Sequence, residues 1–182
     1  YWNDPDRKAV DAKLNNTSGK VEVHELTNKT QLFTERYMVE WLVQNSLGAQ
    51  WLAICARQGW SPKAQEKINK LKTTREVWNQ KISNCEVSET EAMPVNGDEE
   101  FWKYYVAQDL AKETIEAAPF SLDKVKVLDP AMGSGHFLVY VFDFLWELYQ
   151  DQAYLQGEKP YTAKQIIDWI LNNNLHGIDI DN

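Results

Sequence analysis

Residues 127–138 read VLDPAMGSGHFL, and this stretch decides the fold of the region around it. A short apolar run rich in β-branched residues ends at an acid and a proline, and a second apolar stretch begins after two closely spaced glycines. β-Branched residues favour strands, and glycine lets a chain turn sharply or bring its backbone close to a ligand. We therefore expect a strand over 125–129, a tight turn, and a largely buried helix over 135–150.

The pattern that follows predicts an α/β unit. A further helix is expected over 161–173, with Thr162 as its N-cap, and LHGIDID at 175–181 indicates a second short strand. Strand, helix, helix and strand in this order are typical of a parallel sheet, because parallel strands need a crossover connection. The predicted fold class is therefore α/β.

The first 120 residues show mainly helical patterns. Apolar residues recur at helical spacing over 33–57, where Thr34 is a suitable N-cap and Gly48 is expected to end or interrupt the helix. The other expectations are a basic helix that begins at Ser61-Pro62 and covers 61–81, an acidic loop over 86–100, and a long helix over 99–118. We expect two sections, 1–120 and 121–182.

Composition limits the classes of partner. The chain is 43% hydrophobic and contains eight Trp, so it can bury a core or an interface. Its net charge of −8 disfavours tight nucleic-acid binding by this part alone, and the basic run at 61–81 is expected to be a solvated helix face. Two Cys and three His lack the spacing of metal ligands, so we expect no metal site, and a reducing, cytoplasmic setting. No apolar run is long enough for a membrane span.

The glycine turn is a candidate site for a small molecule, because ligands of open α/β sheets bind at the carboxyl ends of strands. A phosphate-binding loop of the form G-x-x-x-x-G-K-[ST] does not occur in the sequence. A dinucleotide loop requires a third small residue, where this chain has Leu138, so NAD and FAD are disfavoured. A third pattern, D-P-x-x-G-S-G at 129–135, resembles the S-adenosylmethionine loop of amino-methyltransferases.

Three stretches resemble motifs of one family, in the order in which that family has them. DPAMGSGHFLV at 129–139 resembles the cofactor loop of adenine-specific DNA methyltransferases, in the form found in large type IIG restriction–modification and phage-exclusion methylases. FTERYMVEWLVQNSLG at 33–48 resembles the helix that closes over the cofactor, and HGIDID at 176–181 resembles the motif that binds its ribose. The resemblance implies a Rossmann-like methyltransferase sheet, of which this chain holds the first strands.

The resemblance also implies roles for individual residues. Asp129 would face the methionine end of S-adenosylmethionine, and Asp179 would accept hydrogen bonds from the ribose hydroxyls. The loop that backs the cofactor would consist of Pro130, Ala131, Gly133 and Gly135, and the end of the pocket would be closed by Phe33 and Thr34. A carboxylate at a strand end is a suitable acceptor for a vicinal diol, which supports the role of Asp179 on chemical grounds.

Some features depart from the family pattern. Asp129 and Asp179 lie 50 positions apart, whereas the acid of a dinucleotide fold follows its glycines by about 20 residues. Asp181 is the rival for the ribose contact. Glu35 replaces the commoner proline of the first motif, and Met132 stands where cysteine is frequent, although the loop presents its backbone to the ligand at that point.

The family's catalytic motif, [NDS]-P-P-[YF], has no counterpart, because no Pro-Pro pair occurs in the sequence. We therefore expect a fragment of a larger protein, with the cofactor half-site and no catalytic residue, inactive by itself and prone to self-association through open sheet edges. The parent would methylate adenine N6 in double-stranded DNA. The alternatives are methylation of protein or RNA, a non-catalytic module that binds a cofactor or partner, and binding of another adenine nucleotide.

Overall fold

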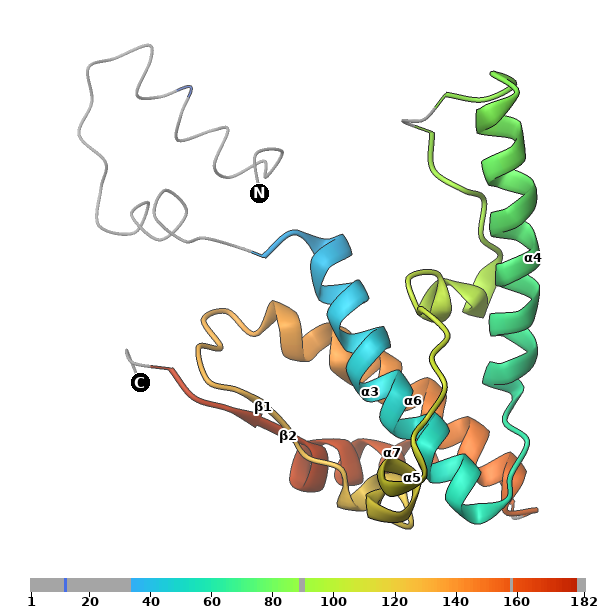
Figure 1. Ribbon diagram of the computed structural model, residues 1–182. Helices are drawn as coiled ribbons and strands as arrows, with labels where there is room; N and C mark the ends of the chain where they lie inside the picture. The colour runs from blue at the N-terminus through green and yellow to red at the C-terminus, as the bar shows by residue number, and fades with distance from the viewer. Residues whose placement is uncertain (1–11, 13–33, 89–90, 158, 180–182) are drawn as a thin grey trace. The chain divides into compact units, whose positions relative to one another are not determined.

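The computed structural model describes residues 12, 34–88, 91–157 and 159–179, shown in colour in Figure 1. The chain divides into two compact units, Tyr1–Val39 and Glu40–Asn182, and each is described by itself. The elements follow in the order α3 (Arg36–Gln58), α4 (Lys63–Ser83), a 3₁₀ helix (Gly97–Trp102), α5 (Lys112–Ala117), a 3₁₀ turn (Leu122–Lys124), β1 (Val127–Asp129), α6 (His136–Leu155), α7 (Ala163–Trp169), a π-helical turn (Ile170–Asn174) and β2 (Leu175–Gly177).

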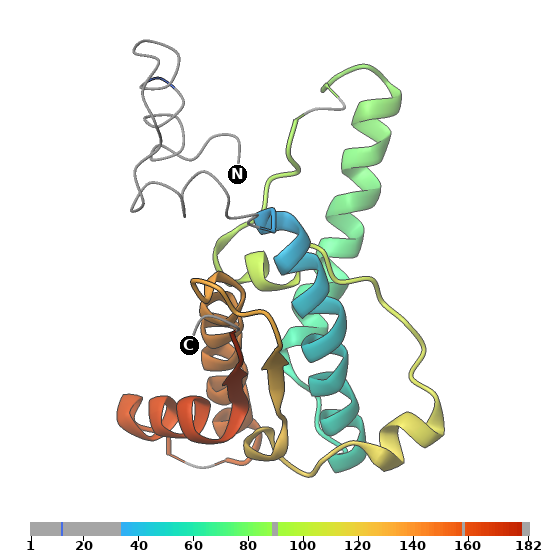
Figure 2. The ribbon, with the colours of Figure 1, turned by 90° about the vertical axis from the view of Figure 1, so that its left-hand side faces the viewer.

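The two strands form a parallel pair. Val127 lies opposite Leu175 and Asp129 opposite Gly177, and α6, α7 and the π-helical turn connect the strands. Figure 2 shows that both strands point toward the glycine turn that leads into α6. The structure therefore confirms the predicted strand–helix–helix–strand order and its parallel sheet, as a small two-stranded element among helices.

A buried asparagine ties the beginnings of the two strands together. Asn174, directly before β2, donates hydrogen bonds from Nδ2 to the carbonyl oxygens of Leu122 and Val125, at 2.8 and 2.7 Å. The hydroxyl of Tyr149 on α6 donates to Asn174 Oδ1 at 2.9 Å. Because buried polar groups need partners, this fully bonded side chain favours one register of the sheet.

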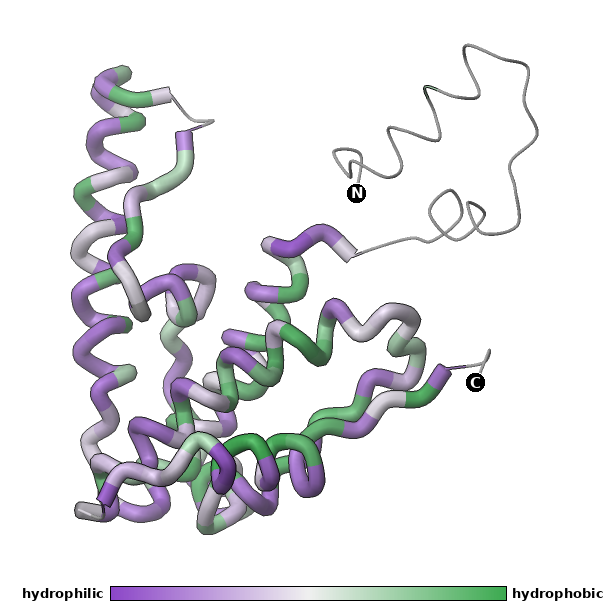
Figure 3. Tube along the Cα trace, turned by 180° about the vertical axis from the view of Figure 1, so that it is seen from behind, coloured by the Kyte–Doolittle hydropathy of each residue, from purple (hydrophilic) through white to green (hydrophobic). Residues whose placement is uncertain are grey.

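Helix α6 is the buried helix that the sequence predicts. Its first residue, His136, follows Gly135, which has φ +79°. The fully buried apolar side chains of the helix are Val141, Phe144, Leu145, Leu148 and Tyr149. In Figure 3 the region of α6 and the strands is coloured largely as hydrophobic, whereas α4 is mostly hydrophilic. Helix α7 also begins as predicted, with the Thr162 hydroxyl accepting from the backbone N–H of Gln165.

Helix α3 does not stop at Gly48, so that prediction is wrong. The helix continues to Gln58, and Gly48 lies within it, facing the side chain of Trp102. A Cβ atom at Gly48 would come within 3.0 Å of Trp102 Cζ3, so the glycine permits close packing rather than a break. The start also differs by one residue, because the backbone carbonyl of Glu35, rather than of Thr34, accepts the first helical hydrogen bonds.

The long helix predicted over 99–118 is also wrong. The acidic segment before it has no helix or strand over 91–96, as expected, and the 3₁₀ helix then ends at Trp102. Residues 105–111 are irregular, and only Lys112–Ala117 is α-helical. The periodic pattern of apolar residues therefore reflects packing against other helices rather than one continuous helix.

Two side chains of α3 supply the physical reason. Gln44 Oε1 accepts from the backbone N–H of Tyr104 at 2.6 Å, and Asn45 Oδ1 accepts from the N–H of Val106 at 2.9 Å. Asn45 Nδ2 donates to the carbonyl of Tyr104 at 2.8 Å. A continuous helix would need these backbone N–H and C=O groups for its own hydrogen bonds. Because they bond to side chains of α3 instead, the segment does not form a long helix.

Part of the basic run on α4 forms ion pairs with acidic residues. Lys67 contacts Glu147 of α6 at 2.8 Å, and Lys70 is paired with Glu99. Lys72 and Lys81 are exposed, so the predicted solvated face holds only in part. The helix begins at Lys63 with Pro62 as the N-cap, one residue later than predicted.

Among the described residues, none of the helices is long and apolar enough to cross a membrane.

Candidate functional site

The glycine turn begins at the carboxyl end of β1. Asp129, the last residue of the strand, accepts a hydrogen bond at Oδ1 from the backbone N–H of Ala131 at 3.1 Å. Gly133 and Gly135 have φ of +52° and +79°, in the left-handed region that side chains disfavour. The two glycines predicted from the sequence are therefore required by the backbone conformation itself.

The carboxyl end of β2 is joined to this turn by hydrogen bonds. Ile178 N–H donates to the carbonyl of Asp129 at 2.9 Å, and Met132 N–H donates to the carbonyl of Ile178 at 2.9 Å. Asp179 Oδ2 accepts from the backbone N–H of Gly133 at 2.6 Å. Two carboxylates, from Asp129 and Asp179, thus accept hydrogen bonds from the amides of Ala131 and Gly133 in one loop.

Gly177 is a residue of this region that the sequence reasoning missed. A Cβ at Gly177 would lie 2.3 Å from Met132 Sδ and 3.1 Å from Leu138 Cδ1. The bare backbone of β2 therefore makes room for the loop and for the first turn of α6. A glycine inside a strand signals such a close approach, and the HGID sequence contains that signal.

His136 lies at the start of α6, beside the same loop. The imidazole is exposed, and its Nδ1 lies 2.6 Å from the Ser134 hydroxyl oxygen. This contact is local to the loop and the first turn of α6. The N-terminus of a 20-residue helix meets the loop here, which favours negatively charged or polar ligand groups.

The structure brings together most of the predicted site residues. Asp129, Pro130, Ala131, Gly133, Gly135 and Asp179 lie on the one turn and the strand end bonded to it. Phe33 lies outside the described residues, as does the rival acid Asp181. Thr34 is exposed in the other compact unit, so its place relative to the loop is not described.

A buried polar cluster anchors the first turns of α6 to α3. Gln44 Nε2 donates to the Tyr140 hydroxyl at 2.8 Å, and burial raises the pKa of Tyr140 to about 12. Lys103 lies 3.0 Å from Glu40 and also pairs with Glu100. Burial lowers the Lys103 pKa, but hydrogen bonds to both glutamates outweigh this effect and raise it overall. The helix that carries the glycine loop is therefore hydrogen-bonded to α3, and the adjoining ion pairs join α3 to the segment around Lys103.

A hollow of ≈ 540 Å³ lies beside β1, on the side that carries no paired strand among the described residues. Its lining comes from α3, the segment 119–126, β1 and α6, and includes Leu42, Val43, Leu47, Val127, Leu128 and Phe137. Leu128 is exposed there although it belongs to a strand. Parallel strands are usually covered on both faces, so this surface is suited to further protein rather than to solvent.

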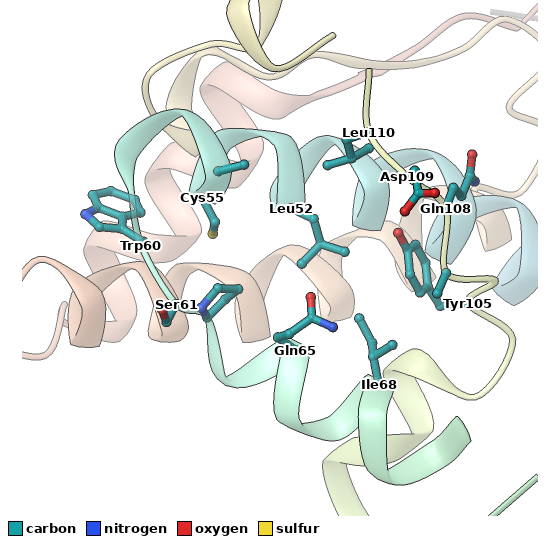
Figure 4. Close-up of a pocket in the computed structure, with 13 residues that line it drawn as sticks. Leu52, Cys55, Trp60, Ser61, Gln65, Ile68, Tyr105, Gln108, Asp109 and Leu110 are labelled. Carbon is teal, nitrogen blue, oxygen red and sulfur yellow. The ribbon is translucent and has the colours of Figure 1, made fainter. Parts of the chain in front are cut away.

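A second hollow, of ≈ 510 Å³, shares no residue with the glycine loop. Figure 4 shows Trp60 at one end, Tyr105, Gln108 and Asp109 at the other, and Leu52 between them. Cys55 also lines this hollow, and burial, with a smaller effect of Asp151, raises the pKa of its thiol. A protonated thiol is a poor nucleophile, so Cys55 does not indicate covalent chemistry.

The loop offers binding groups rather than a reacting group. Its carboxylates can accept hydrogen bonds from hydroxyls or attract cationic groups, and its glycines let a ligand approach the backbone closely. These features fit S-adenosylmethionine, which carries a diol, an ammonium and a sulfonium. The described residues contain no group of three acids, His or Cys that could hold a metal ion.

Comparison with known proteins gives relatives of one kind, although no family model matches the chain. Over 155 residues, 84% of its length, the chain is 31% identical to the adenine-specific methyltransferase PglX of Lacticaseibacillus casei (strain Zhang). Over 173 residues, 94% of its length, it is 30% identical to the adenine-specific methyltransferase BrxX of Escherichia coli O9:H4 (strain HS). A third relative, from Methanocaldococcus jannaschii, carries the provisional name type II restriction enzyme and methyltransferase, and is 41% identical over 70 residues.

These relatives confirm the resemblance, drawn from the motifs, to adenine-specific methyltransferases of the restriction–modification and phage-exclusion kind. The match covers 10% of the length of the PglX protein and 11% of the BrxX protein. The chain thus spans about a tenth of the length of the curated relatives it matches.

Proposed function

We propose that this chain is the cofactor half-site of a DNA methyltransferase that transfers a methyl group from S-adenosylmethionine to adenine N6, in a restriction–modification or phage-defence system. The observation that carries the proposal is the hydrogen bond between Gly133 N–H and Asp179 Oδ2 at 2.6 Å. This bond brings the acid after β2 to the glycine turn after β1. The carboxylate could there bind the diol of a ligand whose other groups contact the loop backbone.

The proposed roles follow from these positions. Asp179 accepts hydrogen bonds from the ribose hydroxyls, and Asp129 faces the methionine end. The glycine turn, with Pro130 and Ala131, backs the cofactor, and the start of α6 favours its carboxylate. S-adenosylmethionine, when bound, supplies the methyl group on a sulfonium centre. This chain would bind and orient that group, and no catalytic residue is assigned within it.

We propose further that residues 1–120 form a mostly helical section, with Phe33, Thr34 and the helix over 33–48 closing the pocket. Residues 121–182 would begin a Rossmann-like core that continues in the parent protein. The parent would bind double-stranded DNA in the cytoplasm, where its substrate lies. The isolated chain would be inactive, and the open side of β1 would favour self-association.

The parent protein provides the direct test. Purified parent, incubated with methyl-labelled S-adenosylmethionine, should label adenine N6 in DNA and leave RNA and protein unlabelled. Asp179→Ala should raise the KM for the cofactor about tenfold or more, because a charge-assisted hydrogen bond is lost. Asp168→Ala is the matched control, because Asp168 pairs with Lys164 on the exposed side of α7.

Other outcomes would replace the proposal with a defined alternative. Label in RNA or protein would support S-adenosylmethionine as the cofactor but would indicate a methyl acceptor other than DNA. Cofactor binding without any transfer would indicate a binding module. Displacement of S-adenosylmethionine by ATP at similar concentrations would indicate a site for another adenine nucleotide.

A further inference from the structure

Four backbone N–H groups of the glycine loop donate hydrogen bonds, and these bonds differ in origin. The bond from Ala131 N–H to Asp129 Oδ1 is local, as is the bond from Gly135 N–H to the Met132 carbonyl. The bond from Met132 N–H to the Ile178 carbonyl joins backbone to backbone. The bond from Gly133 N–H is the one of these four that ends on a side chain of a distant segment, Asp179.

We infer that Asp179 is a positioning residue for the glycine loop, and that it holds the Gly133 N–H before any cofactor is present. Gly133 is exposed and has φ +52°, so little packing fixes its conformation. A hydrogen bond from an amide to a carboxylate is shorter and stronger than one between neutral groups. The contact of 2.6 Å between Gly133 N and Asp179 Oδ2 is therefore the main tether of the loop's tip.

The same carboxylate can hold the loop and a ligand at once. Each oxygen of a carboxylate has two lone pairs, so a bond from Gly133 N–H leaves acceptor capacity for a hydroxyl. A diol bound to Asp179 would thus bind next to an amide that the same side chain has already oriented. Loop order and cofactor affinity become coupled through this one residue. This coupling rests on the proposed function, whereas the loop-positioning role does not.

The test measures the loop in the absence of cofactor. The exchange rate and proton chemical shift of the Gly133 amide would be followed by NMR in the 182-residue chain. Asp179→Ala should speed exchange at Gly133 about tenfold or more and move its proton resonance upfield. Asp179→Asn keeps an acceptor oxygen and should stay closer to wild type. Asp168→Ala should change neither property, because it makes the same replacement away from the loop.

The outcomes separate this inference from the proposed function. Unchanged exchange and shift at Gly133 in Asp179→Ala, with the resonances of Val141 and Leu145 in place to show a folded core, would overturn the positioning role. Faster exchange in that variant, together with a parent protein that does not bind S-adenosylmethionine, would support the role and contradict the proposed function. In a parent that does bind it, cofactor should slow Gly133 exchange in wild type and have less effect in Asp179→Ala.

Discussion

The glycine turn and the junction of α3 with α6 are stabilised in contrasting ways. The turn is largely exposed, and backbone amides bonded to carboxylates and carbonyls define its shape. The junction is rich in buried aromatic side chains, with Trp51, Trp102 and Phe144 almost fully buried. The side chain of Gln44 is also buried there, and it is hydrogen-bonded.

The difference shows how binding and stability are divided in this chain. A loop that must admit a ligand cannot be packed over, so its conformation depends on glycine backbone angles and a few hydrogen bonds. The junction behind it can be packed tightly, and it fixes the helix from which the loop emerges. We therefore expect substitutions at the junction to lower the free energy of unfolding, and substitutions at the turn to act mainly on binding.

The largest effect is expected from Trp102→Ala. This side chain is 1% exposed and makes edge contacts with Phe144 and Tyr105 at 5.3 and 5.5 Å between ring centroids. Its loss should lower the free energy of unfolding by about 3–5 kcal/mol, measured by urea denaturation. Trp41→Ala is the control, because Trp41 is 50% exposed and should cost far less. Equal losses of unfolding free energy in the two variants would contradict the expectation that the buried junction supplies the stability.

Gln44→Ala should have the next largest effect on stability. The fully buried amide bonds the Tyr140 hydroxyl, the Glu100 carbonyl and the Tyr104 N–H, and its loss leaves these groups without that partner. We expect a loss of about 2–3 kcal/mol, with faster hydrogen exchange over 100–106. Gln65→Ala, which removes only an exposed bond to Asn69, should leave both measurements near wild type.

Gly177→Ala tests where the turn meets the sheet. The added methyl would lie 2.3 Å from Met132 Sδ, so the loop must move, at an expected cost of about 1–2 kcal/mol. The parent enzyme carrying this change should lose cofactor affinity more than stability. Adding Met132→Ala should recover much of the affinity, since it removes the sulfur. A double variant as weak as the single one would show that Met132 is not the obstacle.

The smallest effect is a pH dependence at the junction of α4 and α6. Burial raises the pKa of Asp151, although the Lys63 N–H, Trp51 and the charges of Lys67 and Lys63 oppose the shift. A raised folded-state pKa means that the contribution is fully present below the unfolded value of 3.8 and is lost as pH rises through the folded pKa. The stability difference between wild type and Asp151→Asn should therefore change over this window. Carboxyl groups in proteins titrate between about pH 3 and pH 7. A stability difference that stays constant over this range would contradict a raised pKa for Asp151.

The local sequence determined the turn and its surroundings. Positive φ at Gly133 and Gly135 favours glycine, Thr162 is a strong helix cap, and a strand–helix–helix–strand order is typical of a parallel pair. The motifs within these segments were also enough to find the relatives' family. Each of these features depends on residues near one another in the chain, which is why the sequence could reveal them.

Only the tertiary structure decided the segment from Gly97 to Ala117 and the continuity of α3. The amides of Tyr104 and Val106 bond to Gln44 and Asn45, about 60 positions away, so the helical pattern of the segment did not produce a long helix. Gly48 remained helical because Trp102 packs against its bare backbone. The contact between Asp179 and Gly133 likewise spans the two strands. Such choices depend on partners distant in sequence, which no local pattern contains.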